Sequence, residues 1–343
     1  MTAPGPTNLI TDVAGIKVGN AQDGDLLSGV TVVLPDEAAV AAVDARGGAP
    51  GSRETDALDP TCLVDAVHGI VLAGGSVFGL DAASGVMHWL AERGRGFAFR
   101  AQPKVCPVVP AANLFDLTNG GDKDWGDMPP YRDLGLAACE AAGDSFDLGN
   151  AGAGLGALAG RYKGGLGSAS ATWNGATVGA LIAVNPFGSP VIPGTPTLWA
   201  APFEQAGEFG GSGKLEVTLT DETRSLEADT KAALIRSAAE AGQNTTIGVV
   251  ATNARMTPAE AKRIAIMAAD GIARAIRPIH TPYDGDVLFV LSTGAVELDE
   301  PRPFAMAMLG ALAADTVARA IGRALWEAET VGGWKSFRDI HGL

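Results

Sequence analysis

The chain has 343 residues, of which 47% are hydrophobic and 19% are charged. This composition is typical of a folded globular protein and excludes a disordered one. The formal net charge of −14 argues against nucleic acid as a partner, because phosphate binding requires a basic surface. It also argues against binding to anionic membranes.

The cysteines and histidines form no metal-binding or disulfide pattern. The three cysteines are widely spaced without a Cys-x-x-Cys motif, and the four histidines are scattered. The N-terminal residues lack the basic and apolar regions of a secretory signal. The most apolar stretch, 304–328, is interrupted by charged residues and predicts an amphipathic helix instead of a membrane span. We therefore expect a cytoplasmic protein with reduced thiols and no metal site.

The first half of the chain alternates short β-rich runs with helical patterns. We expect strands at 15–18, 29–34, 38–45 and 68–73. We expect helices at 61–67, 80–93 and 134–142.

The second half carries the clearest local signals. Asn174-Gly175 separates two β-rich runs, 169–172 and 176–184, and predicts a hairpin. Thr257 and Glu260 form a capping-box pattern that predicts the start of a helix running to Ile276. We further expect a surface connection at 186–213, a helix at 226–241, strands at 246–251 and 287–292, and a helix at 303–330.

These elements predict an α/β fold. Hairpins alternate with helical crossovers, and several strands are apolar on both faces, which is typical of sheets covered by helices. The only linker-like stretch is 186–213, so we expect a layered sandwich in a single domain.

Two common motif-based functions are excluded. Gly154-x-Gly156 looks like a dinucleotide-binding turn, but no acidic residue stands between Asp147 and Glu204 to bind a ribose. The glycines of 75–79 miss the spacing of a nucleophile elbow by one position.

The junction at 244–246 joins a predicted helix end to a predicted strand and carries two adjacent threonines. The pattern alone favours a plain helix-to-strand turn. A hydroxyl residue in a strained turn can instead attack the carbonyl group before it, and water then splits the resulting ester. The freed threonine has its own α-amine, whose reference pKa of about 7.7–8.0 allows it to act as a base without a histidine.

Several motifs occur in a specific joint order along most of the chain. They are the segments 8–13, 15–19, 74–83, 107–112, 149–154 and 163–168, followed by Asn185, Asn244-Thr245 and 284–286. In these residues the sequence resembles the self-processing L-aminopeptidase/D-esterase family, and most closely its nylon-oligomer (6-aminohexanoate oligomer) hydrolases.

The resemblance implies an αββα sandwich of the N-terminal-nucleophile-hydrolase type. It also implies that the chain cuts itself between Asn244 and Thr245 into a large piece, 1–244, and a small piece, 245–343, which stay together. Thr245 would then be the nucleophile. The aminopeptidase branch has Gly-Ser at this junction, whereas Asn-Thr is typical of the nylon-oligomer branch.

The resemblance further implies roles for five residues. Lys163 would lie beside the nucleophile and support its reactive state by its positive charge. Asn185 would donate a hydrogen bond to the developing oxyanion, with a backbone N–H as second donor. Asp284 and Asp286 would position the freed amine and pair with the lysine. Tyr131 matches the position of the family's active-site tyrosine.

Taken singly, these residues have structural alternatives. Lys163 fits an exposed loop lysine, Asn185 before a proline fits a turn, and 284–286 fits a turn before a strand. The complete pattern favours a hydrolase of 6-aminohexanoate oligomers. An aminopeptidase or D-esterase, and a non-catalytic binding protein on the same scaffold, stay open. The mechanism requires no cofactor or metal, its partner is a small or oligomeric amide substrate, and the resemblance implies a homotetramer.

Overall fold

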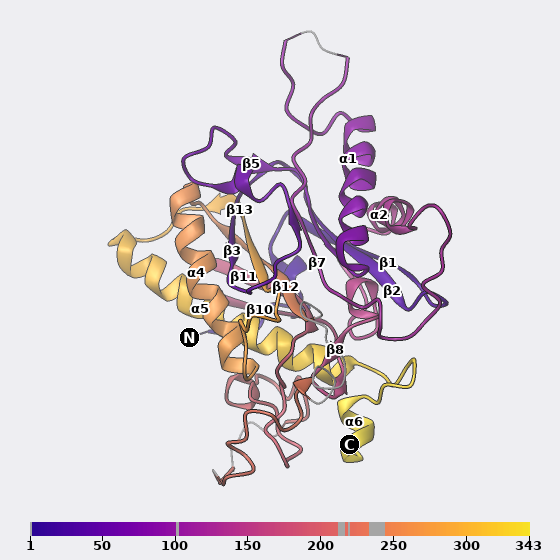
Figure 1. The fold of residues 1–343 in the computed structure, drawn as a ribbon. Coiled ribbons are helices and arrows are strands. Elements are labelled where there is room, and N and C mark those ends of the chain that lie inside the picture. The colour runs from indigo at the N-terminus through magenta and orange to yellow at the C-terminus, as the bar shows by residue number, and fades with distance from the viewer. Residues whose placement is uncertain (1, 101–102, 212–216, 219, 233–243) are drawn as a thin grey trace.

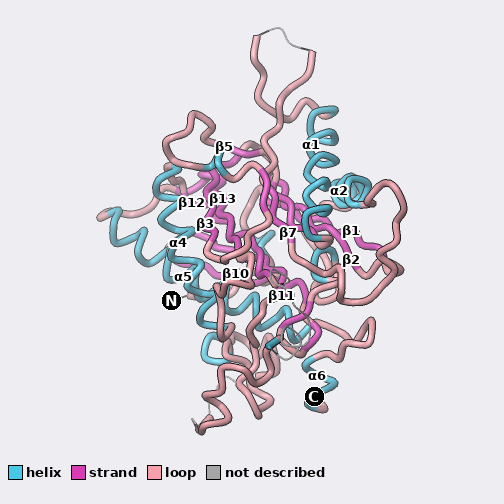
Figure 2. Tube along the Cα trace, viewed as in Figure 1, coloured by secondary structure: helices cyan, strands magenta, loops and turns pink. Residues whose placement is uncertain are grey.

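A computed structural model describes residues 2–100, 103–211, 217–218, 220–232 and 244–343. Its strands form two main sheets (Figures 1 and 2). The five-stranded sheet has the order β1 (Ile16–Asp23), β2 (Ser28–Pro35), β6 (Ile70–Ala73), β7 (Ala111–Asn113) and β4 (Ser52–Arg53). The six-stranded sheet has the order β10 (Gly165–Trp173), β11 (Ala176–Asn185), β12 (Thr245–Ala254), β13 (Val287–Val296), β3 (Ala39–Ala45) and β5 (Ala66–Val67). A two-stranded hairpin is made by β8 (Leu158–Ala159) and β9 (Tyr162–Lys163).

Helices cover both sheets. The five-stranded sheet carries α1 (Ala82–Glu92) and α2 (Tyr131–Glu140), whereas the six-stranded sheet carries α4 (Pro258–Ala275) and α5 (Arg302–Glu327), as Figure 1 shows. The short helix α6 (Phe337–His341) follows near the C-terminus. Single 3₁₀ turns lie at Ile10–Asp12, Asp56–Leu58, Ser76–Asp81, Gly152–Gly154 and Ala201–Phe203.

Alternating side chains divide the hydrophobic core into three layers. Val249 of β12 packs between the two sheets, whereas its neighbour Val250 packs against α4 and α5, because successive side chains of a strand point to opposite faces. A third cluster joins Val30 and Val32 of β2 to α1 and α2. The order of layers is therefore helix, sheet, sheet, helix, which confirms the αββα sandwich.

The longest helix, α5, belongs to this core. It is the one helix in the described part of the chain that is long and apolar enough to cross a membrane, but 72% of its most apolar window is buried in the protein. Arg319 in its middle is fully buried and bonds to Glu208 at 2.6 and 2.8 Å. The amphipathic core helix expected at 303–330 is thus confirmed. It begins one residue earlier than expected, at Arg302, and ends earlier, at Glu327.

The strongest local signals are confirmed. Asn174 and Gly175 have φ angles of +46° and +79° and connect β10 to β11, as the two-residue hairpin turn requires. Thr257 caps α4, and its hydroxyl accepts the Glu260 N–H.

Two expectations are wrong, and one falls partly outside the described residues. The segment 61–67 forms turns and ends in β5, which pairs with β3, in place of a helix. The described part of the connection expected at 186–213, residues 186–211, is no plain surface loop: Val191, Leu198 and Phe209 belong to the core cluster that includes α5. Residues 226–231 of the helix expected at 226–241 form turns and bends, and 233–243 lie outside the described residues.

Candidate active site

Strand register brings the predicted site residues to one end of the six-stranded sheet. β11 runs antiparallel to β12 and pairs its last residue, Asn185, with Thr245. β13 runs parallel to β12, and an isolated bridge extends this pairing back to Asn244 and Asp284. The residues 284–286 therefore lie beside 244–246, although some forty positions separate them in the chain.

The Asn244–Thr245 peptide group lies between a hydroxyl and a backbone amide. The Thr245 hydroxyl donates to the Asn244 carbonyl oxygen at 2.5 Å. The Gly285 N–H donates to the same oxygen at 2.8 Å. A carbonyl that accepts two hydrogen bonds in a buried site is polarised and more open to nucleophilic attack. Thr245 itself is only 4% exposed.

Only a glycine fits at position 285. A Cβ built there would lie 2.8 Å from the Thr245 Oγ1 and 2.6 Å from the Ala49 carbonyl oxygen. Both distances are shorter than real Cβ contacts, so the missing side chain is what lets the backbone approach the threonine.

Asp286 holds the start of β12. Its carboxylate accepts the Thr246 N–H at 2.6 Å, and its other oxygen accepts the His280 N–H at 3.1 Å and faces the His280 Nδ1 at 2.8 Å. The carboxylate thus lies one residue from the Thr245 nitrogen, in a position to stabilise positive charge on a freed amine.

Asp284 is also fully buried, but its carboxylate binds a different set of groups. It accepts the Phe187 N–H at 2.9 Å, and the Thr281 N–H and hydroxyl at 2.9 and 2.6 Å. Burial raises the pKa of Asp284 above its ordinary value, and the nearby Asp286 carboxylate raises this pKa further. Neither aspartate lies in an exposed turn, so the alternative of a plain turn before β13 does not apply.

Asn185 is fully buried at the end of β11 and has every polar atom engaged. Its Nδ2 donates to the Phe115 carbonyl oxygen at 3.0 Å. Its Oδ1 accepts the Leu158 N–H at 2.8 Å and the Lys231 ammonium at 3.2 Å, with Asn119 Nδ2 at 3.5 Å. This network fixes which end of the amide faces which neighbour.

Lys163 is buried, so the alternative of an exposed loop lysine is wrong. Its ammonium donates to the carbonyl oxygens of Gly154, Ala157 and Gly164 at 2.8–3.1 Å. Burial lowers the pKa of Lys163 to about 7, against the opposing effect of the Asp116 carboxylate.

The expected pairing of Lys163 with Asp284 and Asp286 is not what the structure contains. Between these described residues there is no ion pair, because three backbone carbonyls already occupy the ammonium group. The lysine whose charge faces Asp284 is Lys231.

Sequence reasoning missed Lys231. It lies in the stretch expected to form the helix at 226–241, where a lysine is normally solvated, and no motif marks it. In the structure it is 5% exposed, and its ammonium donates to both the backbone and side-chain oxygens of Asn185 at 3.3 and 3.2 Å. Burial lowers its pKa to about 7, and the Asp284 carboxylate opposes this shift.

Tyr131 begins α2 and is fully buried. Its hydroxyl donates to Ser28 Oγ at 3.0 Å, and Ser28 donates to Asp116 at 2.6 Å. Burial, followed by the Asp116 carboxylate, raises the pKa of the Tyr131 phenol. Because Asp116 also acts on Lys163, the tyrosine belongs to the network of that lysine, while its one described hydrogen bond is to Ser28 and not to the threonine.

Several buried polar atoms at the junction have no hydrogen-bond partner in the described part of the chain. Both side-chain polar atoms of Asn244 are among them, together with Thr246 Oγ1 and His280 Nε2. Unsatisfied buried polar groups are unfavourable, and a catalytic role is one explanation for keeping them.

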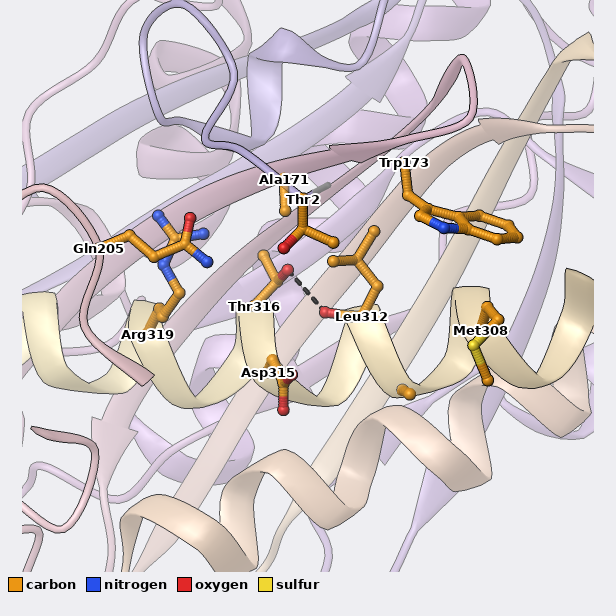
Figure 3. Close-up of a pocket in the computed structure, with 10 residues that line it drawn as sticks. Thr2, Ala171, Trp173, Gln205, Met308, Leu312, Asp315, Thr316 and Arg319 are labelled. Carbon is orange, nitrogen blue, oxygen red and sulfur yellow. Dashed lines mark hydrogen bonds between the residues drawn. The ribbon is translucent and has the colours of Figure 1, made fainter. Parts of the chain in front are cut away.

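The cavity in Figure 3 lies elsewhere. It has a volume of about 180 Å³ and is lined by the Ala171 and Trp173 end of β10 and by one side of α5. Ala171 pairs with Val178, and Val178 pairs with Thr252. This cavity is thus at the opposite end of the strands from Thr245. Among the described residues, no group of three or more His, Cys, Asp or Glu side chains is placed to hold a metal ion.

Comparison with known proteins identifies the family. The model of peptidase family S58 matches residues 8–338. The chain belongs to peptidase family S58. An uncharacterized aminopeptidase of Mycobacterium tuberculosis is 45% identical over 97% of this chain and 98% of that protein. A 6-aminohexanoate-oligomer endohydrolase of Kocuria sp. is 31% identical over 86% of this chain and 77% of that protein.

Solved structures of similar proteins share the fold. The β-aminopeptidase of Burkholderia sp. has a TM-score of 0.72 at 20% identity, over 98% of this chain and 92% of its own. The L-aminopeptidase D-Ala-esterase/amidase of Ochrobactrum anthropi, described as a variant of the Ntn-hydrolase fold, has a TM-score of 0.67 at 22% identity, over 96% and 89%. This S58 family member thus has the N-terminal-nucleophile-hydrolase fold, and it is a hydrolase of amide or peptide bonds.

Proposed function

We propose that this S58 peptidase cuts its own chain between Asn244 and Thr245 and then uses Thr245 as the nucleophile for amide hydrolysis. The observation that carries the proposal is the geometry of the scissile peptide group. The hydroxyl of Thr245 lies 2.5 Å from the Asn244 carbonyl oxygen. The N–H of Gly285, just before β13, donates to the same oxygen at 2.8 Å.

Self-cleavage follows from this arrangement. Thr245 Oγ1 attacks the Asn244 carbonyl carbon and loses its proton, while the Gly285 N–H stabilises the charge on the oxygen. The C–N bond then breaks, the threonine nitrogen takes up the proton, and an ester links the two residues. Water hydrolyses the ester to give the Asn244 carboxylate and restores the hydroxyl of Thr245, which now carries a free amine.

Turnover repeats the same chemistry on a substrate amide. The freed amine of Thr245 accepts the proton of its own hydroxyl, since its reference pKa of about 7.7–8.0 suits a base at neutral pH. The substrate carbonyl takes the place of the Asn244 carbonyl, and the Gly285 N–H becomes the oxyanion donor. The substrate amine leaves with the proton, and water releases the acyl group.

The neighbouring side chains support these steps. Asp286, which holds the next backbone N–H, stabilises the ammonium form of the amine. Asn185 serves as the second oxyanion donor once its Nδ2 is released from the Phe115 carbonyl oxygen. Lys163 and Tyr131 contribute through Asp116, which acts on the pKa of both.

The proposed substrate is an oligomer of ω-amino acids joined by amides, such as 6-aminohexanoate oligomers. The Asn-Thr junction and the 31% identical endohydrolase of Kocuria sp. support this choice. An aminopeptidase or esterase acting on small N-terminal residues is the second candidate, because the 45% identical relative is named an aminopeptidase. Mass spectrometry of the products separates them: internal fragments support the oligomer hydrolase, and stepwise loss of the first residue supports the aminopeptidase.

The cleaved protein is proposed to stay together as the pieces 1–244 and 245–343 and to act in the cytoplasm as a homotetramer. The shared core of the two pieces supports the first part, since β12 is hydrogen-bonded to β11 across the cut. The resemblance to the nylon-oligomer hydrolases supports the tetramer.

Substitution of the nucleophile tests the proposed function. Thr245→Ala removes the attacking hydroxyl, so we expect a single uncut chain without amidase activity. Thr245→Ser keeps a hydroxyl, so we expect it to be cut and to retain activity. Denaturing gel electrophoresis and release of 6-aminohexanoate give both readouts. Processing and turnover in Thr245→Ala would show that Thr245 is not the nucleophile, and an intact, inactive wild-type chain would favour the non-catalytic binding protein.

A further inference from the structure

Lys231 is a buried cation whose only described acceptors belong to one residue of the site. Its ammonium donates to the backbone oxygen of Asn185 at 3.3 Å and to the side-chain oxygen at 3.2 Å. Its backbone N–H donates to the Phe187 carbonyl oxygen at 3.0 Å. The lysine is thus fixed on the segment that follows β11, directly behind the strand end that pairs with Thr245.

A charge at this position acts on the acidic residues beside the Asn244–Thr245 junction. The Asp284 carboxylate opposes the lowering of the Lys231 pKa, and Asp286 in turn raises the pKa of Asp284. A buried ammonium is unfavourable unless nearby groups compensate for its lost hydration. Asn185 and Asp284 provide this compensation, and both lie next to the Asn244–Thr245 peptide group.

The ammonium also determines how the Asn185 amide is oriented. A lysine can only donate hydrogen bonds, so the Asn185 atom that faces it must be the oxygen. The Leu158 N–H imposes the same choice at 2.8 Å. With the oxygen held on this side, the Asn185 NH₂ group is directed away from the lysine, where it donates to the Phe115 carbonyl oxygen, and it is the end that can donate to the oxyanion once released from Phe115.

We propose that Lys231 is a positioning residue of the active site, which holds the oxygen of the Asn185 amide so that the NH₂ group is the end that donates to the oxyanion. This inference rests on the proposed function, because it assumes that Thr245 is the nucleophile.

The test compares Lys231→Met, Lys231→Arg and the matched control Lys262→Met. Methionine keeps an unbranched side chain, one atom shorter, and removes the charge, whereas arginine keeps the charge. Lys262 on α4 donates to the Val43 carbonyl oxygen, on the far side of the six-stranded sheet from the α1 and α2 layer. Self-cleavage is followed by mass spectrometry, and turnover of a 6-aminohexanoate oligomer is normalised to the cleaved fraction.

We expect Lys231→Met to lower the self-cleavage rate and the kcat of oligomer turnover about 100-fold each, as misplacement of a reactive group does. Lys231→Arg should recover most of the loss, and Lys262→Met should equal the wild type. The pH profile adds a readout that lost packing alone would not move. The Lys231 ammonium is lost as the pH rises through about 7, whereas an arginine stays charged, so the wild-type rate relative to that of Lys231→Arg should fall as the pH rises through this range.

The outcomes separate the two proposals. If the wild type cuts itself and hydrolyses amides while Lys231→Met matches it in rate and pH profile, the role of Lys231 is wrong and the proposed function stands. If the wild type does neither, the proposed function fails and takes the role of Lys231 with it. Lys231→Gln replaces Lys231→Met if the latter is insoluble, and equal rates in that variant overturn the inference in the same way.

Discussion

At the scale of single residues, the candidate site and its surroundings contain two buried lysines and the two buried aspartates Asp116 and Asp284. Lys163 faces Asp116 and Lys231 faces Asp284. Isolated charges in a protein interior are unfavourable, so buried lysines tend towards their neutral form. Both lysines have a pKa lowered to about 7, which places their charge change close to the range where the α-amine of Thr245 would titrate after the proposed cut.

These lysines predict how stability depends on pH. The unfolded chain keeps each lysine protonated up to its ordinary pKa of 10.5, whereas the folded chain releases the proton near pH 7. Between these values the unfolded state binds more protons, so the contribution of these lysines to the free energy of unfolding rises with pH. Denaturant unfolding of the uncut Thr245→Ala chain between pH 7 and 9 measures this rise.

The matching control is the same uncut chain with Lys163 and Lys231 both changed to methionine. Its unfolding free energy should rise less over this pH range than that of Thr245→Ala alone. Equal slopes in the two proteins would show that folding does not lower the pKa of these two lysines.

At the scale of elements, the parallel pairing of β12 with β13 assembles the site. The pairing of Ile247 with Val287 sets the register, and it brings Gly285 against the Asn244 carbonyl. The loop 45–49 closes over the same place, because a Cβ on Gly47 would lie 2.3 Å from the Asp286 nitrogen. Close backbone contact, more than side-chain packing, therefore determines the geometry of the Asn244–Thr245 peptide group.

Gly285→Ala tests this close contact. The added Cβ would meet the Thr245 hydroxyl at 2.8 Å and the Ala49 carbonyl oxygen at 2.6 Å, so either the donor or the nucleophile must move. We expect self-cleavage to slow by about 100-fold or more, since loss of one oxyanion donor has effects of that order. Gly24→Ala is the control, because nothing lies within 4 Å of a Cβ at that position. Equal cleavage rates in the two variants would exclude Gly285 as the donor.

Sequence patterns predicted those elements whose signals are local. The Asn174-Gly175 hairpin and the Thr257 cap depend on neighbouring residues, and the structure contains both. The segment 61–67 was mispredicted because its pairing partner, β3, lies in a different part of the chain. The segment 186–213 was mispredicted because its glycines and prolines indicate turns but cannot show that the turns are covered by α5.

The candidate site shows the same division. The family motifs pointed to Thr245, Asn185 and the acidic pair, and strand register brings these residues together. The partner of each lysine could not be predicted, because it depends on which buried carboxylate lies nearest in space. Lys231 had no signal, since burial of a lysine within a polar stretch leaves no trace in the pattern.

At the scale of the whole molecule, the proposed cut would divide the αββα sandwich without separating its layers. Residues 245–343 supply β12, β13, α4 and α5, which complete the six-stranded sheet and its helical cover. The remaining strands of that sheet come from the other side of the cut. Each piece therefore lacks part of the core, and the two pieces should remain associated after cleavage under native conditions.

The most direct test is the intact mass of the purified protein under denaturing conditions. The small piece would contain 99 of the 343 residues and begin Thr-Thr-Ile. If strain at the Asn244–Thr245 junction drives the cut, two pieces should form. In proportion to the total of 34.8 kDa, their masses should be roughly 25 and 10 kDa. Our account predicts both masses in place of the full-length one. A single species of 34.8 kDa that persists after prolonged incubation would contradict it.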